Sequence, residues 1–504
     1  MQHAENLAPG VHLRVHLPAA CLAFLALACS NAPRRGNTVI LASGADLQSP
    51  NPLLTTHPLA RQIQRYALLV TLVRYDSTLT PVPYLARSWT WSPDSTLLTM
   101  RLFSGLAWHD GTLTTARDAQ WTLDAARDSA GVYPRRRDLA GLIEVTAPDD
   151  STLLLRFGRP TAKIPDVLTD LALLPRHLLD TSARRGGLRQ AGWNRRPVGN
   201  GPFRFVAYEA NRRWVFEANR GFPAELGGPP RLDRFVVAVV DEPTTKLAAL
   251  TSGELDLAGI NPAHAQFVRK NSRLTVLDYP LLFSYALIFN TRKPPFDRLE
   301  ARQRVTDGLD SHAMVDGVLF GFGTPASGPL PPALMGISDI PSPSSAVIPS
   351  PSSAVIPSRR RGIPAPEAGA PLTFELLTVG SGEAALEQML QSQLSAHGIT
   401  AEIRQLELST FLDRVEGRAR DFDAAVLGIS GDLALGHLAR ILGIAGLPVE
   451  GAPAELVGRI QDSTAAAFLY HARGVQGVNR RVKGITMDLR GELVTLPRWW
   501  VERQ

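Results

Sequence analysis

One acidic residue stands where the sequence predicts a binding crevice. Asp432 follows the apolar run Asp423–Ser430, which is typical of a buried strand, within the order Gly-Ile-Ser-Gly-Asp. In open parallel sheets, ligands bind at the carboxyl ends of strands, because the loops there face the crevice. A carboxylate at this place can pair with a ligand's ammonium group, and Ser430 is predicted to line the same site. The alternative is that Asp432 caps a helix over Leu433–Leu442.

Four further residues are candidate ligand-binding residues, because binding pockets use few polar groups among many apolar ones. They are Asn51 in the first loop, Trp108, Asn200 in a glycine-rich turn, and Tyr285 in a later apolar run. Each has a structural alternative. The two asparagines would fix loops by hydrogen bonds, the tryptophan would fill a core, and the tyrosine would pack on a sheet.

Residue patterns that carry catalysis are missing from the sequence. It contains no Walker lysine, no Gly-x-Ser-x-Gly, no His-Glu-x-x-His and no Cys-x-x-Cys. The 11 histidines are scattered, and the close pair His12 and His16 precedes the predicted mature chain. His109 is expected to be a hydrogen-bonded turn residue. The sequence therefore predicts no enzyme, no catalytic residue, no cofactor and no metal site.

Length and charge limit the class of protein further. A chain of 504 residues with 44% hydrophobic and 20% charged residues predicts a soluble globular protein of two or more domains. The net charge of +6 is small for this size. The arginine triplets Arg135–Arg137 and Arg359–Arg361 lack interleaved aromatic residues, so we interpret them as solvated turns and predict no nucleic-acid binding.

The N-terminal segment predicts export. Both cysteines, Cys21 and Cys29, lie in it, and the apolar run Leu17–Cys29 is too short for a transmembrane helix. Residues 1–29 are therefore predicted to be a signal peptide, with Leu25–Cys29 resembling a bacterial lipobox and Cys29 as the lipidated residue. The alternative is an ordinary signal peptide that releases a soluble protein.

The first half of the chain predicts strands, turns and short helices. Thr38–Ser43 has the pattern of a buried strand, and Arg61–Val73 has helical periodicity. Ser88–Asp128 predicts two strands around a Pro-Asp turn, then a helix whose Thr115 and Asp118 form a capping box. A strand at Leu281–Thr291 follows later.

The second half predicts alternating elements. Arg302–Phe320 is expected to form a helix, and the repeat Ile340–Ser358 is too rich in proline and serine to pack a core. Strands at Leu372–Thr378, Ala401–Glu407 and Asp423–Ser430 alternate with helical segments. This order predicts a parallel α/β lobe.

Four motifs carry a family resemblance. They are Tyr84–Trp89 with the following Ser-Pro-Asp-Ser turn, Trp108–Thr112, the turn Pro197–Phe203, and Gly253–Asp256. Together they resemble the family 5 extracytoplasmic solute-binding proteins, the peptide- and nickel-binding receptors of ABC transporters. In that family an aspartate after a similar strand end holds the α-amino group of a dipeptide, which the resemblance carries over to Asp432.

The resemblance implies an α/β, two-lobed periplasmic-binding-protein-like fold of class II type, with mixed sheets and two crossover strands as a hinge. Lobe one is expected at residues 30–280, with a subdomain at about 80–195, and lobe two at 281–470. Residues 471–504 would return to lobe one. The segment after residue 432 is shorter than the family's usual one.

The implied function is that of a lipid-anchored, monomeric substrate-binding protein of the bacterial periplasm or cell envelope. It would capture peptides and deliver them to an ABC permease. Nickel chelates, sugars, opines and haem are alternative ligands. The rival interpretation is a sensor or chaperone lipoprotein on the same scaffold, which the shortened segment favours.

Overall fold

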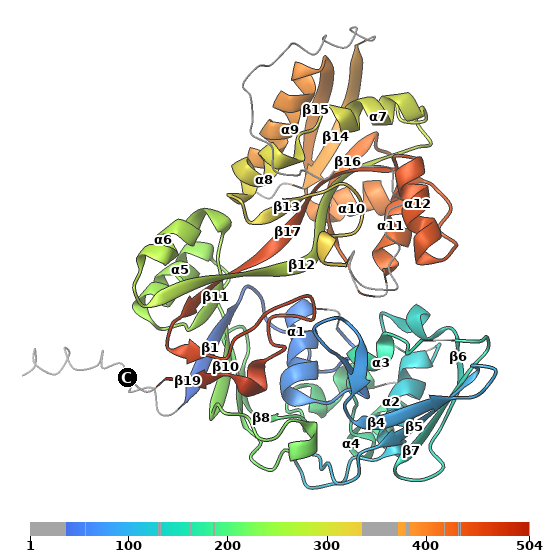
Figure 1. Cartoon of the computed structure of the whole chain (residues 1–504), viewed down its shortest axis with the longest axis vertical. Coiled ribbons are helices and arrows are strands. Elements are labelled where there is room, and N and C mark those ends of the chain that lie inside the picture. Colours follow the sequence, from blue (N-terminus) through green and yellow to red (C-terminus); the bar gives the residue numbers. More distant parts are fainter. Residues whose placement is uncertain are drawn as a thin grey trace, which may run out of the picture.

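The computed structural model describes residues 37–55, 57–129, 131, 133–161, 163–184, 187–334, 371–379, 384–417, 419–431, 433 and 435–502. The predicted signal peptide with Cys29, the repeat Ile340–Ser358 and Asp432 lie outside these residues. Two lobes stand one above the other and are joined by two long strands (Figure 1). These are β12 (Leu274–Phe289) and β17 (Ala466–Asn479), which pair with each other in antiparallel fashion.

One sheet runs through both lobes along these two strands. Its order is β15-β14-β16-β12-β17-β11-β1-β10-β9-β8, and β13 pairs with β17 beside this path. The lobe-one strands are β1 (Thr38–Ser43), β8 (Phe203–Glu209), β9 (Arg213–Ala218), β10 (Arg234–Val239) and β11 (Leu257–Gly259). The lobe-two strands are β13 (Gly323–Pro325), β14 (Leu372–Val379), β15 (Ile399–Leu406) and β16 (Ala424–Ser430).

A second sheet lies within lobe one. Its antiparallel order is β4-β5-β7-β6. The members are β4 (Ala86–Trp91), β5 (Leu97–Leu102), β6 (Leu142–Thr146) and β7 (Thr152–Phe157). Two short pairs complete the strands: β2 (Val73–Tyr75) with β3 (Pro81–Pro83), and β18 (Val482–Lys483) with β19 (Trp500–Val501).

Helices cover these sheets. Those of lobe one are α1 (Pro58–Ile63), the π-helix η1 (Gln64–Leu68), α2 (Ala116–Arg127), α3 (Val167–Asp170), α4 (Arg176–Arg184), α5 (Pro243–Ser252) and α6 (Ala265–Lys270). Those of lobe two are α7 (Leu299–Asp307), α8 (Ser311–Leu319), α9 (Ala384–Ala396), α10 (Leu408–Glu416), α11 (Gly436–Ala445) and α12 (Pro453–Asp462).

Lobe two buries both faces of its sheet. On β14, Leu376 packs into the core under α7, α8 and α9, whereas its neighbour Leu377 packs into the core under α10, α11 and α12. Successive strand side chains point to opposite faces, so one strand serves two cores. β14 pairs with β15 and β16 in parallel, and β12 pairs with β16 in antiparallel fashion. The fold class is therefore confirmed as two-lobed α/β with a mixed sheet.

The predicted strand–turn–strand–helix block is confirmed. β4 and β5 pair across the Pro-Asp turn, and α2 begins after Thr115, whose backbone N–H donates to the carboxylate of Asp118 at 2.9 Å. This reciprocal cap satisfies amides that have no partner within the helix.

Two helix predictions are wrong in extent. The helix expected over Arg61–Val73 ends at Leu68, because the carbonyl of Leu68 accepts from the backbone N–H groups of Asn200 and Gly201. A Cβ at Gly201 would lie 2.5 Å from the Ala67 carbonyl oxygen, so this close approach requires glycine. The helix expected over Arg302–Phe320 is two helices, since α7 ends at Asp307 and Asp310 caps α8.

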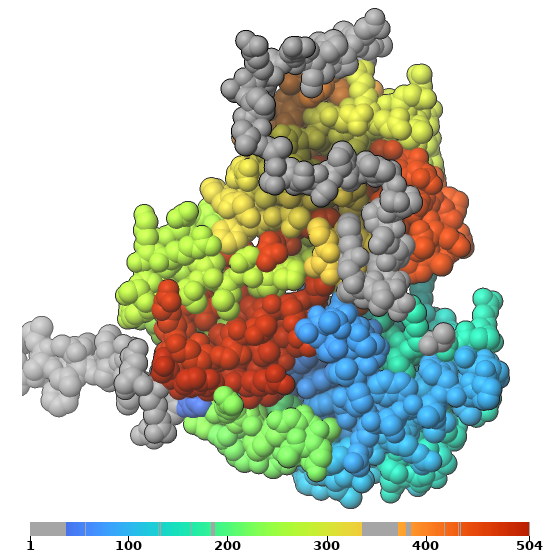
Figure 2. Space-filling view, viewed as in Figure 1, coloured from blue at the N-terminus to red at the C-terminus, as the bar shows by residue number. Residues whose placement is uncertain are grey.

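The chain after β17 returns to lobe one. In Figure 2 this red segment lies on the front of lobe one, between the blue N-terminal part and the green part. In the described part of the chain, no helix is both long and apolar enough to cross a membrane.

Candidate functional site

A cavity of about 380 Å³ lies where the two lobes meet. Its lobe-one wall comes from α1, η1, β2, the residues around α3 and the returning segment 488–492. Residues 279–283 of the crossover strand β12 form its floor, and the tip of β16 reaches it from lobe two. The cavity therefore draws residues from both lobes and from the strand that links them.

Three arginines of the lobe-one wall share one carboxylate. Arg61 Nη2 and Arg135 Nη1 each lie 2.5 Å from Asp170 Oδ2, and Arg65 Nη1 lies 2.8 Å from Oδ1. Burial alone would raise the pKa of Asp170, but the charges of Arg65, Arg61 and Arg135 outweigh it and lower that pKa to about 2. Arg135 also pairs with Asp138 at 2.6 Å. This wall is thus held rigid by ion pairs and carries an excess of positive charge.

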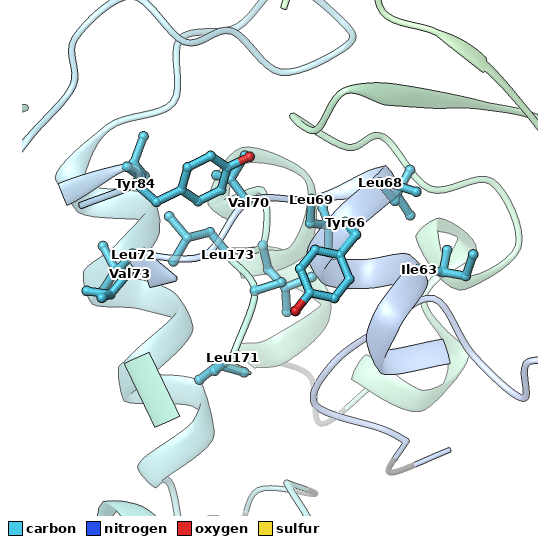
Figure 3. Close-up of a cluster of buried hydrophobic side chains, with 14 of the residues drawn as sticks. Ile63, Tyr66, Leu68, Leu69, Val70, Leu72, Val73, Tyr84, Leu171 and Leu173 are labelled. Atoms are coloured by element: carbon cyan, nitrogen blue, oxygen red, sulfur yellow. The ribbon is translucent and has the colours of Figure 1, made fainter. Parts of the chain in front are cut away.

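Local sequence explains how the first two arginines reach the same partner. Arg61 and Arg65 are four residues apart along the continuous α1–η1 segment, which puts both on one helix face. Buried side chains of the same segment, among them Ile63, Tyr66 and Leu68, anchor it in the lobe-one core (Figure 3). That anchoring turns the guanidinium groups toward Asp170, which ends α3.

A fourth and a fifth arginine lie beside this group. The Arg74 guanidinium carbon stands 3.4 Å from the centre of the Tyr84 ring, and Arg74 Nη2 donates to the Arg65 carbonyl at 3.3 Å. Arg490 pairs with Asp488 at 2.6 Å. The hydrogen bond from Asp488 raises the pKa of Arg490, which therefore stays charged.

A half-buried carboxyl group, that of Glu492, lies between the floor and the lobe-one wall. Tyr279 Oη donates to Glu492 Oε1 at 2.7 Å. Burial raises the pKa of Glu492, and the hydrogen bond from Tyr279 opposes this only in part. Burial, with the nearby Glu492 carboxylate, also raises the pKa of Tyr279. This pair can accept or donate hydrogen bonds at the cavity surface.

The lobe-two wall is small and, among its described residues, uncharged. It consists of Ser430, Gly431 and Leu433. β16 and β14 run in parallel, so their carboxyl ends lie at one edge of the sheet. The Gly431 N–H donates to the Leu282 carbonyl at 2.6 Å, which ties this tip to β12. A strand end in a crevice is the place where open α/β sheets bind ligands.

The predicted site residues fall into two groups. Ser430 lines the cavity, and the sequence neighbours of the undescribed Asp432, Gly431 and Leu433, line it as well. The other four lie outside the cavity lining. They are Asn51, Trp108, Asn200 and Tyr285.

Those four make structural contacts. Asn200 is fully buried, and its Oδ1 accepts from the Val70 N–H at 3.1 Å. Asn51 is also buried, and its Oδ1 accepts from the Leu53 N–H at 3.0 Å. Tyr285 packs on Tyr470 across the two crossover strands, with ring centres 5.0 Å apart.

Of the two aromatic turn residues, Trp108 is buried and His109 is half-buried. Trp108 is 2% exposed and lies in the lobe-one core. His109 Nε2 lies 3.0 Å from the Gly201 carbonyl oxygen, and burial lowers its pKa to about 4. His109 is therefore a neutral, hydrogen-bonded turn residue, as expected.

The sequence analysis did not predict that arginines line the cavity. The interpretation of Arg135–Arg137 as a solvated turn is wrong for Arg135, whose side chain is 18% exposed and bound to Asp138 and Asp170. The four-residue spacing of Arg61 and Arg65 was a usable signal for one helix face. Their shared partner lies more than a hundred residues away, so it could not be read from local patterns.

Metal ligands do not gather anywhere in the part of the chain that the structure describes. There, no group of three or more histidine, cysteine, aspartate or glutamate residues is placed to hold an ion. The described site therefore offers hydrogen bonds and charge, with most of the charge on arginine.

Curated relatives match parts of this chain. A putative ABC transporter peptide-binding protein of Brucella ovis is 30% identical over 259 residues, which is 51% of this chain and 48% of that protein. The chain thus spans about half the length of that relative. The di/tripeptide-binding protein 2 of Pseudomonas aeruginosa is 27% identical over 399 residues, 73% of this chain and 70% of that protein.

A solved structure shares the whole fold. The oligopeptide-binding protein AppA of Bacillus subtilis, in complex with a nonapeptide, superposes with a TM-score of 0.71 at 20% identity, covering 92% of this chain and 99% of that one. The family model described as bacterial extracellular solute-binding proteins, family 5 middle, matches residues 80–437, more than half of the chain. The chain belongs to the bacterial extracellular solute-binding proteins of family 5.

Proposed function

We propose that this chain is the substrate-binding protein of an ABC importer, which encloses a peptide or a similar small solute and delivers it to a membrane permease. One observation carries the proposal. The cavity is built from lobe one, lobe two and the strand between them, so a solute held there touches all three. The peptide-binding names of the relatives support the same ligand class.

Capture would work by closure of the lobes. β12 and β17 connect the lobes as paired strands (Figure 1). A solute that contacts both walls binds the closed arrangement better than the open one, and so shifts the population toward it. The permease would then recognise the closed arrangement.

Asp432 is proposed to bind the ammonium group of the solute. Its neighbours Gly431 and Leu433 line the cavity, and β16 ends at this point. A charge-assisted hydrogen bond of this kind is worth about 1.5–3 kcal/mol. Asp432→Asn should therefore weaken binding of a dipeptide by about tenfold or more in calorimetry, and leave binding of its N-acetylated form unchanged. Equal affinities for wild type and variant would remove this role.

Mass spectrometry of the solutes that copurify with the protein tests the proposal as a whole. We expect short peptides to be released on denaturation, and a purified peptide mixture to raise the melting temperature of the emptied protein. If no small molecule is recovered and no peptide shifts the melting temperature, the protein is better explained as a sensor or chaperone on the same scaffold.

The cell-envelope location and the lipid anchor are also proposals. They rest on the resemblance of Leu25–Cys29 to a lipobox. Full-length protein expressed in a bacterium should partition into the detergent phase, and Cys29→Ala should move it to the aqueous phase. Equal aqueous partitioning of both would exclude the anchor.

A further inference from the structure

The lobe-one wall of the cavity is rich in guanidinium groups. Its lining holds five arginines, namely Arg61, Arg65, Arg74, Arg135 and Arg490, and four acidic residues, namely Asp166, Asp170, Asp488 and Glu492. Burial of Glu492 favours its neutral form. The cations of this wall therefore outnumber its anions.

The acidic residues are already engaged within the wall. Asp170 pairs with three arginines, and Asp488 pairs with Arg490. Asp166 accepts a hydrogen bond from Tyr75, and Glu492 accepts one from Tyr279. Among the five arginines, Arg74 is the one for which the described part of the chain shows no ion pair.

Arg74 is nevertheless held in one place. Its guanidinium stacks on the Tyr84 ring, and the Arg65 carbonyl accepts from its Nη2. Its Nε is buried and has no acceptor among the described residues. A partly buried cation is unfavourable unless an anion pairs with it, because moving a charged group from water into a protein costs free energy.

The neighbours of Arg74 reinforce the positive potential. Arg65 supplies the carbonyl that fixes Arg74, and the Nε of Arg65 is also buried without an acceptor in the described residues. Arg490 Nη1 donates to the carbonyl of Tyr75, the residue after Arg74. The side chains of Arg74 and Arg490 are thus both hydrogen-bonded at one short stretch around β2, beside the backbone of Arg65. Guanidinium groups suit carboxylates, since their N–H donors match the two carboxylate oxygens.

We propose that Arg74, supported by Arg65 and Arg490, forms an anion subsite that binds a carboxylate of the solute, so that the protein selects carboxylate-bearing solutes over neutral analogues. This inference rests on the proposed function and adds to it the chemical class of the solute. The subsite lies in lobe one, so it is present before the lobes close.

The test is a comparison of acid and amide probes by calorimetry. The probes are the dipeptide Ala-Leu with its C-terminal amide, and glutarate with glutaramide. In wild type each acid should bind about tenfold or more tightly than its amide. Arg74→Gln should remove that difference by weakening the acid alone. Arg74→Lys, which keeps the charge and loses the planar fork, should retain part of it.

Arg212→Gln is the matched control, because Arg212 is an exposed lobe-one arginine that is not part of the cavity lining. It should bind all four probes as wild type does. Melting curves without a probe show whether each variant folds. If Arg74→Gln does not fold, the acid-to-amide affinity ratios of wild type and Arg74→Lys test whether Arg74 binds the carboxylate.

The outcomes separate this inference from the proposed function. Equal binding of acid and amide by wild type would overturn the subsite and leave peptide capture intact. Binding of glutarate but of neither dipeptide probe would uphold the subsite and overturn peptide as the solute. Binding of none of the four probes would contradict both.

Discussion

The two walls of the cavity are built from different chemistry. The lobe-one wall carries five arginines, four of them in ion pairs within the lobe. The described lobe-two wall offers Ser430, Gly431 and Leu433 at the tip of β16. If the lobes close on a solute as proposed, lobe one would contact its charged groups before closure, and lobe two would add its contacts on closure.

Removal of the carboxylate of Asp170, whose side chain is 9% exposed, should give the largest loss of stability. Asp170→Asn leaves three guanidinium groups without their common partner, and breaking a buried ion pair costs about 3 kcal/mol or more. We expect a loss of this size in the free energy of unfolding, measured by urea titration. Asp150→Asn, at an exposed ion pair with Arg117, should cause no measurable loss.

The difference in unfolding free energy between wild type and Asp170→Asn should depend on pH. The pKa of Asp170 is lowered from 3.8 to about 2, so its ion pairs stabilise the folded state above about pH 4 and lose this effect as the pH falls toward 2. The difference in unfolding free energy between wild type and Asp170→Asn should shrink by roughly 2 kcal/mol over that interval. A difference that is constant with pH would show that Asp170 does not act as a charge.

A smaller loss of stability is expected from a glycine substitution where the crossover strands meet the lobe-one wall. A Cβ at Gly474 would lie 2.1 Å from Tyr279 Cζ, so Gly474→Ala must displace the ring that donates to Glu492. Overpacking of this kind costs about 1–3 kcal/mol, measurable as a lower melting temperature. Gly259→Ala on β11, where the nearest neighbouring atom would be 3.8 Å away, is the control. Equal melting temperatures for the two variants would contradict this packing.

The smallest effect on stability is expected from a change of Glu492 itself, which is half-buried. Burial raises the pKa of Glu492 above its ordinary 4.5, so ionisation destabilises the folded state as the pH rises above that value. Glu492→Gln removes the ionisation and keeps an acceptor for Tyr279. We expect its unfolding free energy to exceed that of wild type by about 1 kcal/mol or less at neutral pH, and to vary less with pH. If the unfolding free energies of Glu492→Gln and wild type varied with pH in the same way, the Glu492 carboxylate would be solvated in the folded protein.

The sequence predicted one wall better than the other. Strand β16 follows from its apolar run, and the rule that ligands collect at strand ends points to Ser430 and its neighbours. Local patterns of this kind are visible in a few consecutive residues. The α/β character of lobe two was predicted by the same means, whereas the two-lobed fold was implied by the family resemblance.

The lobe-one wall could not be predicted in this way. Arg65 and Arg135 meet Asp170 from segments 35 to 105 residues away, and Arg490 comes from the far end of the chain. Asn51 and Asn200 accept hydrogen bonds from loop backbone, which agrees with their structural alternative, since polar residues in glycine-rich or proline-rich loops often fix the backbone instead of a ligand. Only tertiary packing decides between these roles.

The distance between the lobes tests the central claim most directly. Both cysteines lie within residues 1–29, so a protein that starts at residue 30 has no native thiol, and in it Arg159→Cys on lobe one and Ala454→Cys on lobe two can carry spin labels. Both positions are exposed and lie outside the cavity lining. If a solute is enclosed between the lobes, saturating Ala-Leu should shorten the measured distance and narrow its distribution. A distance distribution that stays the same with bound solute would contradict enclosure.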